Sequence, residues 1–421
     1  MKTLIKKAFI LNKKSPFHKQ TKDLLIENEI IIKIDENIKD ENIDQIIQEE
    51  GLTISEGWID MKVHARTPGD EHKEDFNTLT NAALKGGFTE LVITSDSDPT
   101  NDNKSITKTI IAENTGKLLN FYPIGSISKN RKGEQLTEMF DMQQNGAVLF
   151  GDDKPIENSF LMLNALLYSK NFNGLISSFP EDSNLTKGGQ MNEGITSTKL
   201  GLKGIPNYTE SIRVNRDLYL ADYAEAPIHF SPITTKESIA LIKEAKKKGQ
   251  QVTSETHPYY LFLNDEFLES FDSNYKVTPP LRSENDRKAL IEAIKNKTIE
   301  VISSNHSPEN IENKALEFEL AENGMIGLET FFSLCYTALK NEIEIEDIIE
   351  TFTVNVRKLL GLNCVTIKEG EKANISIFTT KLNSTYNHEN YASKSKNTPF
   401  TDIELNGKVI GAYNKGKLHL N

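Results

Sequence analysis

The sequence predicts an α/β protein: a closed (β/α)8 barrel of the TIM type, with a small β-sandwich domain formed by both ends of the chain. Three observations lead to this fold class. Eight short apolar runs recur between residue 58 and about residue 305, helix-like stretches separate them, and both chain ends lack long helices. Alternation of strands and helices favours a parallel sheet. A count of eight strands favours a closed barrel, although an open doubly wound sheet shows the same alternation of strands and helices.

The expected barrel strands are, in chain order, WIDMKVH, ELVITS, NFYPIGSI, GAVLFG, GLISSF, PIHFSPI, QVTSET and EVISSN. The amphipathic stretches 236–249 and 284–297 predict helices, and Ser283 is placed to cap the second of them. No G-x-G-x-x-G follows the first run and no G-x-x-x-x-G-K-[ST] motif occurs, which argues against a nucleotide-binding sheet.

The two chain ends carry short strand-like runs. LIKKAFIL and EIIIKI lie near the N-terminus, and ANISIFT and GKVIGAYNKGKLHL lie near the C-terminus. We predict that residues 1–53 and 365–421 together form the small β domain, and that residues 54–364 form the barrel. The acidic stretch KDENIDQIIQEEG, residues 39–51, is expected to be a solvated loop or helix face.

Composition narrows the possible partners and compartments. The net charge of −12 argues against nucleic acid or an anionic membrane as the main partner. The N-terminal residues lack a signal-peptide core, and no apolar run reaches bilayer length. Cys335 and Cys364 lie in apolar contexts and are expected to be buried free thiols. A reducing, cytoplasmic location fits these features.

Functional side chains of such a barrel lie where its strands end and in the loops that follow. A two-metal hydrolytic site there needs several neutral imidazoles and at least two carboxylates. Only His64, His257 and His306, of eight histidines, fall at suitable strand ends. The polar, aromatic and proline positions at these ends are Lys62, His64, Arg66, Ser95, Asp96, Asp98, Asp152, Asp153, Phe179, Pro232, His257, Tyr259, Tyr260, Asn305 and His306.

Nearly the whole chain resembles the bacterial dihydroorotases of the cyclic amidohydrolase superfamily. The motifs that carry the resemblance are GWIDMKVHARTPGDEHKED, AALKGGFTELV, GAVLFGDDKP, EDSNL, GLKGIPNYTES, TTKES, NYKVTPPLR, GLET and SKSKNTPF. The resemblance implies a barrel of the metal-dependent hydrolase type, with a small β domain from both termini. It also implies a place in pyrimidine biosynthesis.

The sequence departs from the family at the metal-contact positions. Where the family has D-x-H-x-H, this chain has Asp60, Lys62 and His64, so the first histidine is replaced. The resemblance places six metal contacts, of which only His64 and Asp153 keep the family's residue type. The six positions are Lys62, His64, Asp153, Phe179, Pro232 and Asn305.

These replacements predict that the metal site is lost. Zinc is held by nitrogen donors and negative charge at about 2 Å, and Phe179 and Pro232 offer no side-chain donor. Asn305 stands where the family has a general base, and an amide does not take up the proton. A protonated Lys62 would put positive charge where the metal belongs, and we expect it to pair with Asp153. We therefore expect no cofactor and assign no catalytic residue.

The resemblance also implies the substrate pocket. Arg66 is kept, whereas Asp96 and Thr278 replace asparagines and a Tyr259–Tyr260 pair replaces histidines. An aspartate at position 96 would repel a substrate carboxylate, so we expect the pocket to suit something else.

The preferred hypothesis is a dihydroorotase-like protein of pyrimidine biosynthesis that lacks catalytic activity and acts as a structural partner. The resemblance makes aspartate carbamoyltransferase the candidate partner, and we also expect a homo-oligomer. Two alternatives stay open. One is an active cyclic amidohydrolase, acting on dihydroorotate or another ring amide, with zinc in a reduced site or in one relocated to His257 and His306 together with Asp152 or Glu255. The other is a protein that binds a small ligand in the old pocket without turnover.

Overall fold

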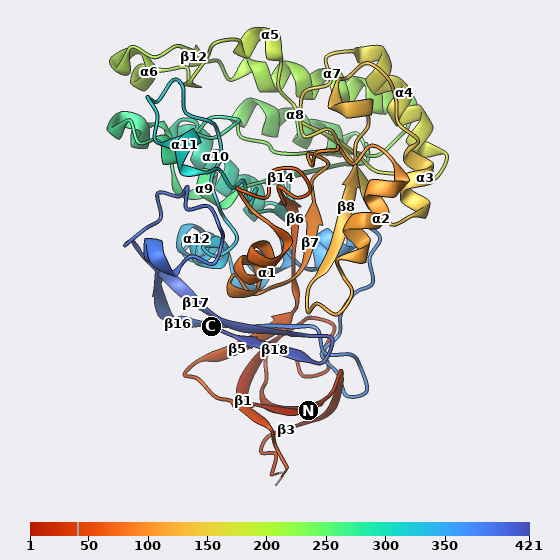
Figure 1. The fold of residues 1–421 in the computed structure, drawn as a ribbon, viewed down its shortest axis with the longest axis vertical. Helices are drawn as coiled ribbons and strands as arrows, with labels where there is room; N and C mark the ends of the chain where they lie inside the picture. The colour runs from red at the N-terminus through yellow and green to blue at the C-terminus, as the bar shows by residue number, and fades with distance from the viewer. Residues whose placement is uncertain (40–41) are drawn as a thin grey trace.

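A barrel of eight parallel strands forms the larger part of the molecule (Figure 1). The computed structural model describes residues 1–39 and 42–421. A bridge between Val63 and His306 and a 3.0 Å hydrogen bond from the His64 amide to the His306 carbonyl join the last strand to the first. The predicted fold class is confirmed. In sheet order the strands are β6 (Trp58–Val63), β7 (Phe88–Ile93), β8 (Asn120–Gly125), β9 (Leu149–Phe150), β10 (Ile176–Ser178), β13 (Ile228–Phe230), β14 (Val252–Thr256) and β15 (Val301–Ile302).

Helices cover the outside of the barrel. The two helices expected from the sequence are present as α8 (Lys236–Lys247) and α10 (Glu284–Lys295). Within residues 1–39 and 42–421, no helix has the length and apolar character needed to cross a membrane. The others are α1 (Phe76–Lys85), α2 (Lys104–Ala112), α3 (Met139–Gln144), α4 (Ser159–Lys170), α5 (Ser183–Thr186), α6 (Ile195–Leu200), α7 (Tyr208–Ala224), α9 (Pro258–Phe262), α11 (Ile311–Lys314), α12 (Phe331–Leu339), α13 (Ile345–Glu350) and α14 (Val354–Leu359).

A second sheet, the β domain, combines both ends of the chain. Its order is β18-β17-β16-β5-β1-β2-β3, and β5 pairs antiparallel with β16 so that the N-terminal and C-terminal segments meet. The boundaries at residues 53/54 and 364/365 stay a prediction. The strands are β1 (Lys2–Leu11), β2 (Thr21–Glu27), β3 (Ile30–Asp35), β4 (Gln45–Ile47), β5 (Leu52–Glu56), β16 (Ile375–Thr385), β17 (Glu404–Asn414) and β18 (Lys417–Leu420).

The acidic stretch 39–51 is not wholly a loop or helix face. Its central residues form β4, which pairs parallel with β1, because Ile47 is buried in the core of the β domain. Residues 40–41 of this stretch lie outside the described residues.

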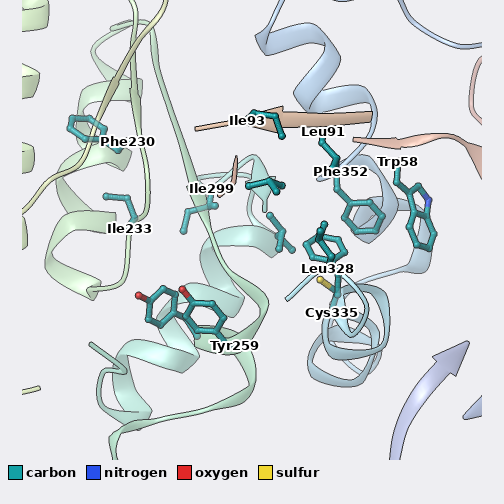
Figure 2. Packing of buried hydrophobic residues seen from close by; sticks show 14 of the residues in the cluster. Trp58, Leu91, Ile93, Phe230, Ile233, Tyr259, Ile299, Leu328, Cys335 and Phe352 are labelled. Carbon is teal, nitrogen blue, oxygen red and sulfur yellow. The ribbon is translucent and has the colours of Figure 1, made fainter. Parts of the chain in front are cut away.

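Buried aromatic residues hold the β domain against the barrel. The ring of Trp58, at the start of β6, lies 5.3 Å from Phe352 and 5.4 Å from Phe378 of β16. Cys335 is buried, as expected, in the same hydrophobic cluster as Phe352 (Figure 2). The expectation for Cys364 is wrong: this thiol is exposed, because it lies in the surface connection between α14 and β16.

Candidate functional site

Lys62 lies inside the barrel mouth, near the end of β6, and is buried. Its Nζ is 2.6 Å from Asp153 Oδ1, which is the pairing expected from the sequence, and it donates to Ser231 Oγ at 3.3 Å. The ammonium also lies 5.3 Å from the centre of the Phe179 ring, a cation–π contact. The lysine thus connects three neighbouring strand ends, and Pro232 follows directly after its hydroxyl partner.

His64, Asp153 and Asn305 come together beside this lysine. His64 Nε2 is 3.5 Å from Asp153 Oδ2 and 3.3 Å from Asn305 Oδ1. The other ring nitrogen of His64 is 2.7 Å from Asp96 Oδ2. The Asn305 amide donates to the Tyr259 hydroxyl at 2.9 Å, which fixes the orientation of the amide group. These five expected site residues therefore share one network of hydrogen bonds and ion pairs.

Both buried carboxylates of this network are held ionised by side-chain cations. Burial would raise the pKa of Asp153, but Lys62 and His64 outweigh it and the pKa lies below its usual value. Burial likewise opposes ionisation of Asp96, yet His64 and Arg66 bring its pKa well below the usual value. Basic side chains of the chain itself therefore pair with both carboxylates.

Arg66 is engaged by the protein itself. Its guanidinium donates to Asp96 Oδ2 at 3.2 Å, to Glu309 Oε1 at 2.9 Å and, through Nε, to the Pro308 carbonyl at 3.1 Å. A substrate carboxylate would have to displace these internal partners. The arrangement orders the first and last loops of the barrel and does not present a free anion site.

The backbone at the mouth is strained at three of these positions. Arg66, Asp153 and Asn305 have φ values of 58°, 49° and 48°, in the left-handed region. Such a conformation costs a non-glycine residue roughly 1–2 kcal/mol and occurs preferentially at functional sites. Positive φ values are thus found at three of the expected site residues at the barrel mouth.

The two aromatic residues expected in the substrate pocket pack against each other. Tyr259 and Tyr260 are buried, with ring centres 4.5 Å apart, and Thr278 lies exposed at the edge of the loop that carries the Tyr260 hydrogen-bond partner, Pro279. A separate cavity inside the barrel, lined in part by Lys62, Asp153 and Phe179 but by none of the expected substrate-pocket residues, measures about 20 Å³. That volume is enough for about one water molecule.

Comparisons with known proteins identify the family. A family model described as dihydro-orotase-like matches residues 51–238. A dihydroorotase of Acetivibrio thermocellus is 43% identical over 392 residues, which cover 92% of each chain. A dihydroorotase of Geobacter metallireducens is 39% identical over 399 residues, which cover 94% of each chain. The chain belongs to the dihydroorotase family.

Among solved structures, L-hydantoinase (dihydropyrimidinase) from Arthrobacter aurescens has the same fold, with a TM-score of 0.86 at 20% identity, covering 99% of this chain and 95% of that one.

The metal that the family implies does not fit the donor set of this member. His64, Asp153 and Asn305 offer one imidazole, one carboxylate and one neutral amide, and Lys62 already occupies the carboxylate. Throughout residues 1–39 and 42–421, no three His, Cys, Asp or Glu side chains are arranged to hold a metal ion. These side chains therefore do not support a metal-dependent mechanism.

The candidates for a relocated metal are tied to different segments. His257 donates to the Ser303 carbonyl at 3.0 Å, and burial together with Lys62 lowers its pKa to about 3. His306 lies with Nε2 3.4 Å from Glu74 and accepts the Gly327 amide proton at Nδ1. The structure does not bring the two rings into one donor set.

A buried polar row lies below Lys62, and the sequence assigned only Glu255 of this row, as a carboxylate for a relocated metal. His229 Nε2 lies 3.7 Å from Glu255 Oε2, and the Ser231 hydroxyl donates to Glu255. Burial would raise the pKa of Glu255, but His229 outweighs it and the pKa is about 2. A signal was present for two of the three: His229 on β13 and Ser231 directly after it are two residues apart, so the period of a strand places both side chains on one face. Glu255 lies on the neighbouring strand, β14.

Proposed function

We propose that this member of the dihydroorotase family is catalytically inactive and serves pyrimidine biosynthesis as a structural partner in the cytoplasm. One observation carries the proposal: the 2.6 Å ion pair between Lys62 and Asp153. A zinc ion bound to Asp153 would lie within about 4–5 Å of the ammonium. At that distance the repulsion is roughly 7 kcal/mol for an effective dielectric constant of about 20. That is a large part of the roughly 10–16 kcal/mol with which complete structural sites bind zinc.

A general base for ring-amide hydrolysis is also missing. Asn305 stands at the position of the family's general base, and its amide takes no proton from water. The alternative of an active enzyme with a reduced or relocated site is not favoured, because within residues 1–39 and 42–421 no side-chain contact joins the imidazole rings of His64, His257 and His306.

The proposed partner role rests on the fold and the sequence that the chain shares with its relatives. The fold and about two-fifths of the residues agree with named dihydroorotases over more than nine-tenths of the chain, although the metal donors are replaced. A folded barrel that has lost its metal donors still has a surface that can bind another protein. Aspartate carbamoyltransferase is the partner we propose. Co-expression and co-elution of the two proteins test this part, and independent elution with no measurable binding would contradict it.

Metal content and turnover test the inactive state. Protein purified without chelator is expected to contain substoichiometric zinc and to show no hydrolysis of dihydroorotate and no ring closure of carbamoyl aspartate. A dihydroorotase prepared alongside serves as the positive control. Stoichiometric zinc, or turnover that His64→Ala abolishes, would overturn the proposal.

A variant with restored metal donors tests the same proposal by gain of zinc binding. Lys62→His, Phe179→His, Pro232→His and Asn305→Asp together return the family's residue types to all four changed positions. This variant is expected to bind zinc, whereas a version that keeps Lys62 and carries only the other three changes is expected to bind it far more weakly. Equal zinc binding by both variants would show that the lysine is not what excludes the metal.

A further inference from the structure

Two side chains that border the cavity inside the barrel each have a buried polar atom without a partner. His229 of β13 and Glu255 of β14 both line this cavity, and their side chains are 0% and 1% exposed. Within residues 1–39 and 42–421, neither His229 Nε2 nor Glu255 Oε2 has a hydrogen-bond partner. Buried polar atoms of folded proteins are paired with few exceptions, so these two atoms need an explanation.

The two atoms do not satisfy each other. They lie 3.7 Å apart, whereas a hydrogen bond from a ring nitrogen to a carboxylate oxygen spans about 2.7–3.2 Å. The other polar atom of each group is already engaged: His229 Nδ1 is 2.9 Å from the Thr253 hydroxyl, and Glu255 Oε1 accepts a proton from Ser231. A separation of this size between two polar atoms is typical of a pair that a water molecule bridges.

The cavity has the size and the lining that one water molecule requires. A water molecule fits in a space of about 10–15 Å³ or more, so this cavity of about 20 Å³ has room for one. Empty cavities in proteins are lined by apolar side chains. This one is bordered by the polar side chains of Lys62, Ser95 and Ser177 as well as by His229 and Glu255.

We propose that one water molecule is bound in this cavity as a fixed part of the structure, where it bridges His229 Nε2 and Glu255 Oε2. A water molecule donates to the carboxylate and can either donate to the imidazole or accept from it, so it fits both tautomers of His229. An ammonium ion only donates, and a chloride ion would meet the negative charge of Glu255. Water therefore suits this pair of atoms better than either ion.

The bound water completes a chain of hydrogen bonds that ends at the barrel mouth. Ser231 donates to Glu255 and accepts from Lys62 Nζ at 3.3 Å, and Lys62 pairs with Asp153 at 2.6 Å. By engaging the second oxygen of Glu255, the water fixes the orientation in which this carboxylate meets Ser231. The water is held by side chains alone and has a structural role, so this inference does not depend on whether the protein is inactive.

A crystal structure of the full chain tests the proposal, at a resolution that shows ordered water molecules and from solutions without ammonium salts. A density peak is expected in the cavity within about 3.2 Å of both His229 Nε2 and Glu255 Oε2. An empty cavity, or a direct hydrogen bond between the two side chains, would overturn the proposal. Zinc content and turnover do not enter this result.

Two variants at Ser177 test the bridge by displacing the water. Ser178 bonds to Asp217 of α7 outside the barrel, so strand alternation places Ser177 on the inner face, where it lines the cavity. Ser177→Val adds a methyl group at the cavity wall, whereas Ser177→Ala removes the hydroxyl without adding volume and serves as the matched control. The density peak is expected to persist in the alanine variant and to disappear from the valine variant.

Urea denaturation of the same two variants gives a second measurement. The midpoint of Ser177→Val is expected to lie below that of Ser177→Ala, because the valine leaves His229 and Glu255 buried without their shared partner. Valine favours strands more than alanine does, so strand propensity acts against this order. A valine midpoint equal to or above the alanine midpoint would indicate a dry cavity that the methyl group fills. That result, or a peak that survives in the valine variant, would overturn the proposal.

Discussion

At the residue scale, Lys62 supplies the positive charge that pairs with the carboxylates inside the barrel mouth. Asp153 and Glu255 are buried carboxylates with lowered pKa values, and an uncompensated charge in such surroundings costs several kcal/mol. A lysine supplies the missing cation from within the chain. An ammonium nitrogen has no vacant coordination position, however, so it cannot bind and acidify a water molecule as a metal does. Charge balance and metal chemistry are therefore separable at this site.

Removing the cation alone should destabilise the protein. Lys62→Met leaves Asp153 buried without its nearest partner, and we expect the free energy of unfolding to fall by about 3–5 kcal/mol. Lys62→Met with Asp153→Asn removes both charges and should recover much of this loss. Urea denaturation of the wild type, both single variants and the double variant measures the coupling. A double variant no more stable than Lys62→Met would contradict the pairing as the source of the effect.

Asp60, a buried residue of β6, predicts an unusual pH dependence of the free energy of unfolding. Burial raises its pKa to about 7, and its Oδ2 atom has no hydrogen-bond partner within the described chain. Because the folded pKa lies above the unfolded one, its contribution to stability is complete below about pH 4 and is lost as the pH rises toward 7. Each pKa unit is worth about 1.4 kcal/mol.

Asp60→Asn should remove this pH dependence. The variant's free energy of unfolding, relative to the wild type, is expected to increase steadily between about pH 4 and pH 7 and then level off. Denaturant titrations across that range measure the difference. A difference that stays constant with pH would show that Asp60 does not titrate there.

At the element scale, several barrel helices begin with a short polar side chain that accepts a backbone N–H. Such caps set where each helix starts and so fix the length of the preceding loop at the barrel mouth. The capping residues are Asp75, Asn103, Asn158, Thr235 and Ser283 for α1, α2, α4, α8 and α10.

Ser283 offers the clearest test, because the sequence alone assigned its role. Its hydroxyl accepts the Asp286 amide proton at 3.3 Å and also contacts the Asp286 carboxylate. Ser283→Ala is expected to lower the free energy of unfolding by about 1 kcal/mol, whereas Ser283→Thr keeps the hydroxyl and should cost less. Thermal unfolding of the two variants side by side gives the comparison, and equal losses would argue against the cap.

Elements defined by a local pattern could be predicted, and those defined by tertiary contacts could not. Apolar runs bounded by polar residues marked all eight barrel strands, and Ser283 marked a helix start. By contrast, β4 forms because β1 is beside it, and Cys364 is exposed because its segment crosses the surface. The residue types left at the mouth suggested the Lys62–Asp153 pair, but the strained backbone and the contribution of Glu255 depend on strands that only the closed barrel brings together.

At the scale of the whole molecule, the barrel and the β domain share a core around Trp58. This residue begins β6, yet its amide donates to Ser376 and its indole to Ser55, each at 2.9 Å and each in the β domain. Arg357, also buried, donates to the Gly57 carbonyl at 2.8 Å where the chain passes from one domain to the other. Neither domain can separate without exposing this ring and breaking these bonds.

The chain therefore should unfold as one cooperative unit. Trp58 is the single tryptophan of the chain, so its fluorescence reports the junction between the domains, while far-ultraviolet circular dichroism reports mostly the barrel helices. If docking and barrel stability are coupled, both signals change at the same denaturant concentration. Phe378→Ala removes a ring that packs on Trp58 from the β domain and should shift both midpoints together, by about 3–5 kcal/mol in free energy. A fluorescence change that precedes the circular dichroism change would instead mean that the β domain undocks while the barrel persists, and the shared core would not be what couples them.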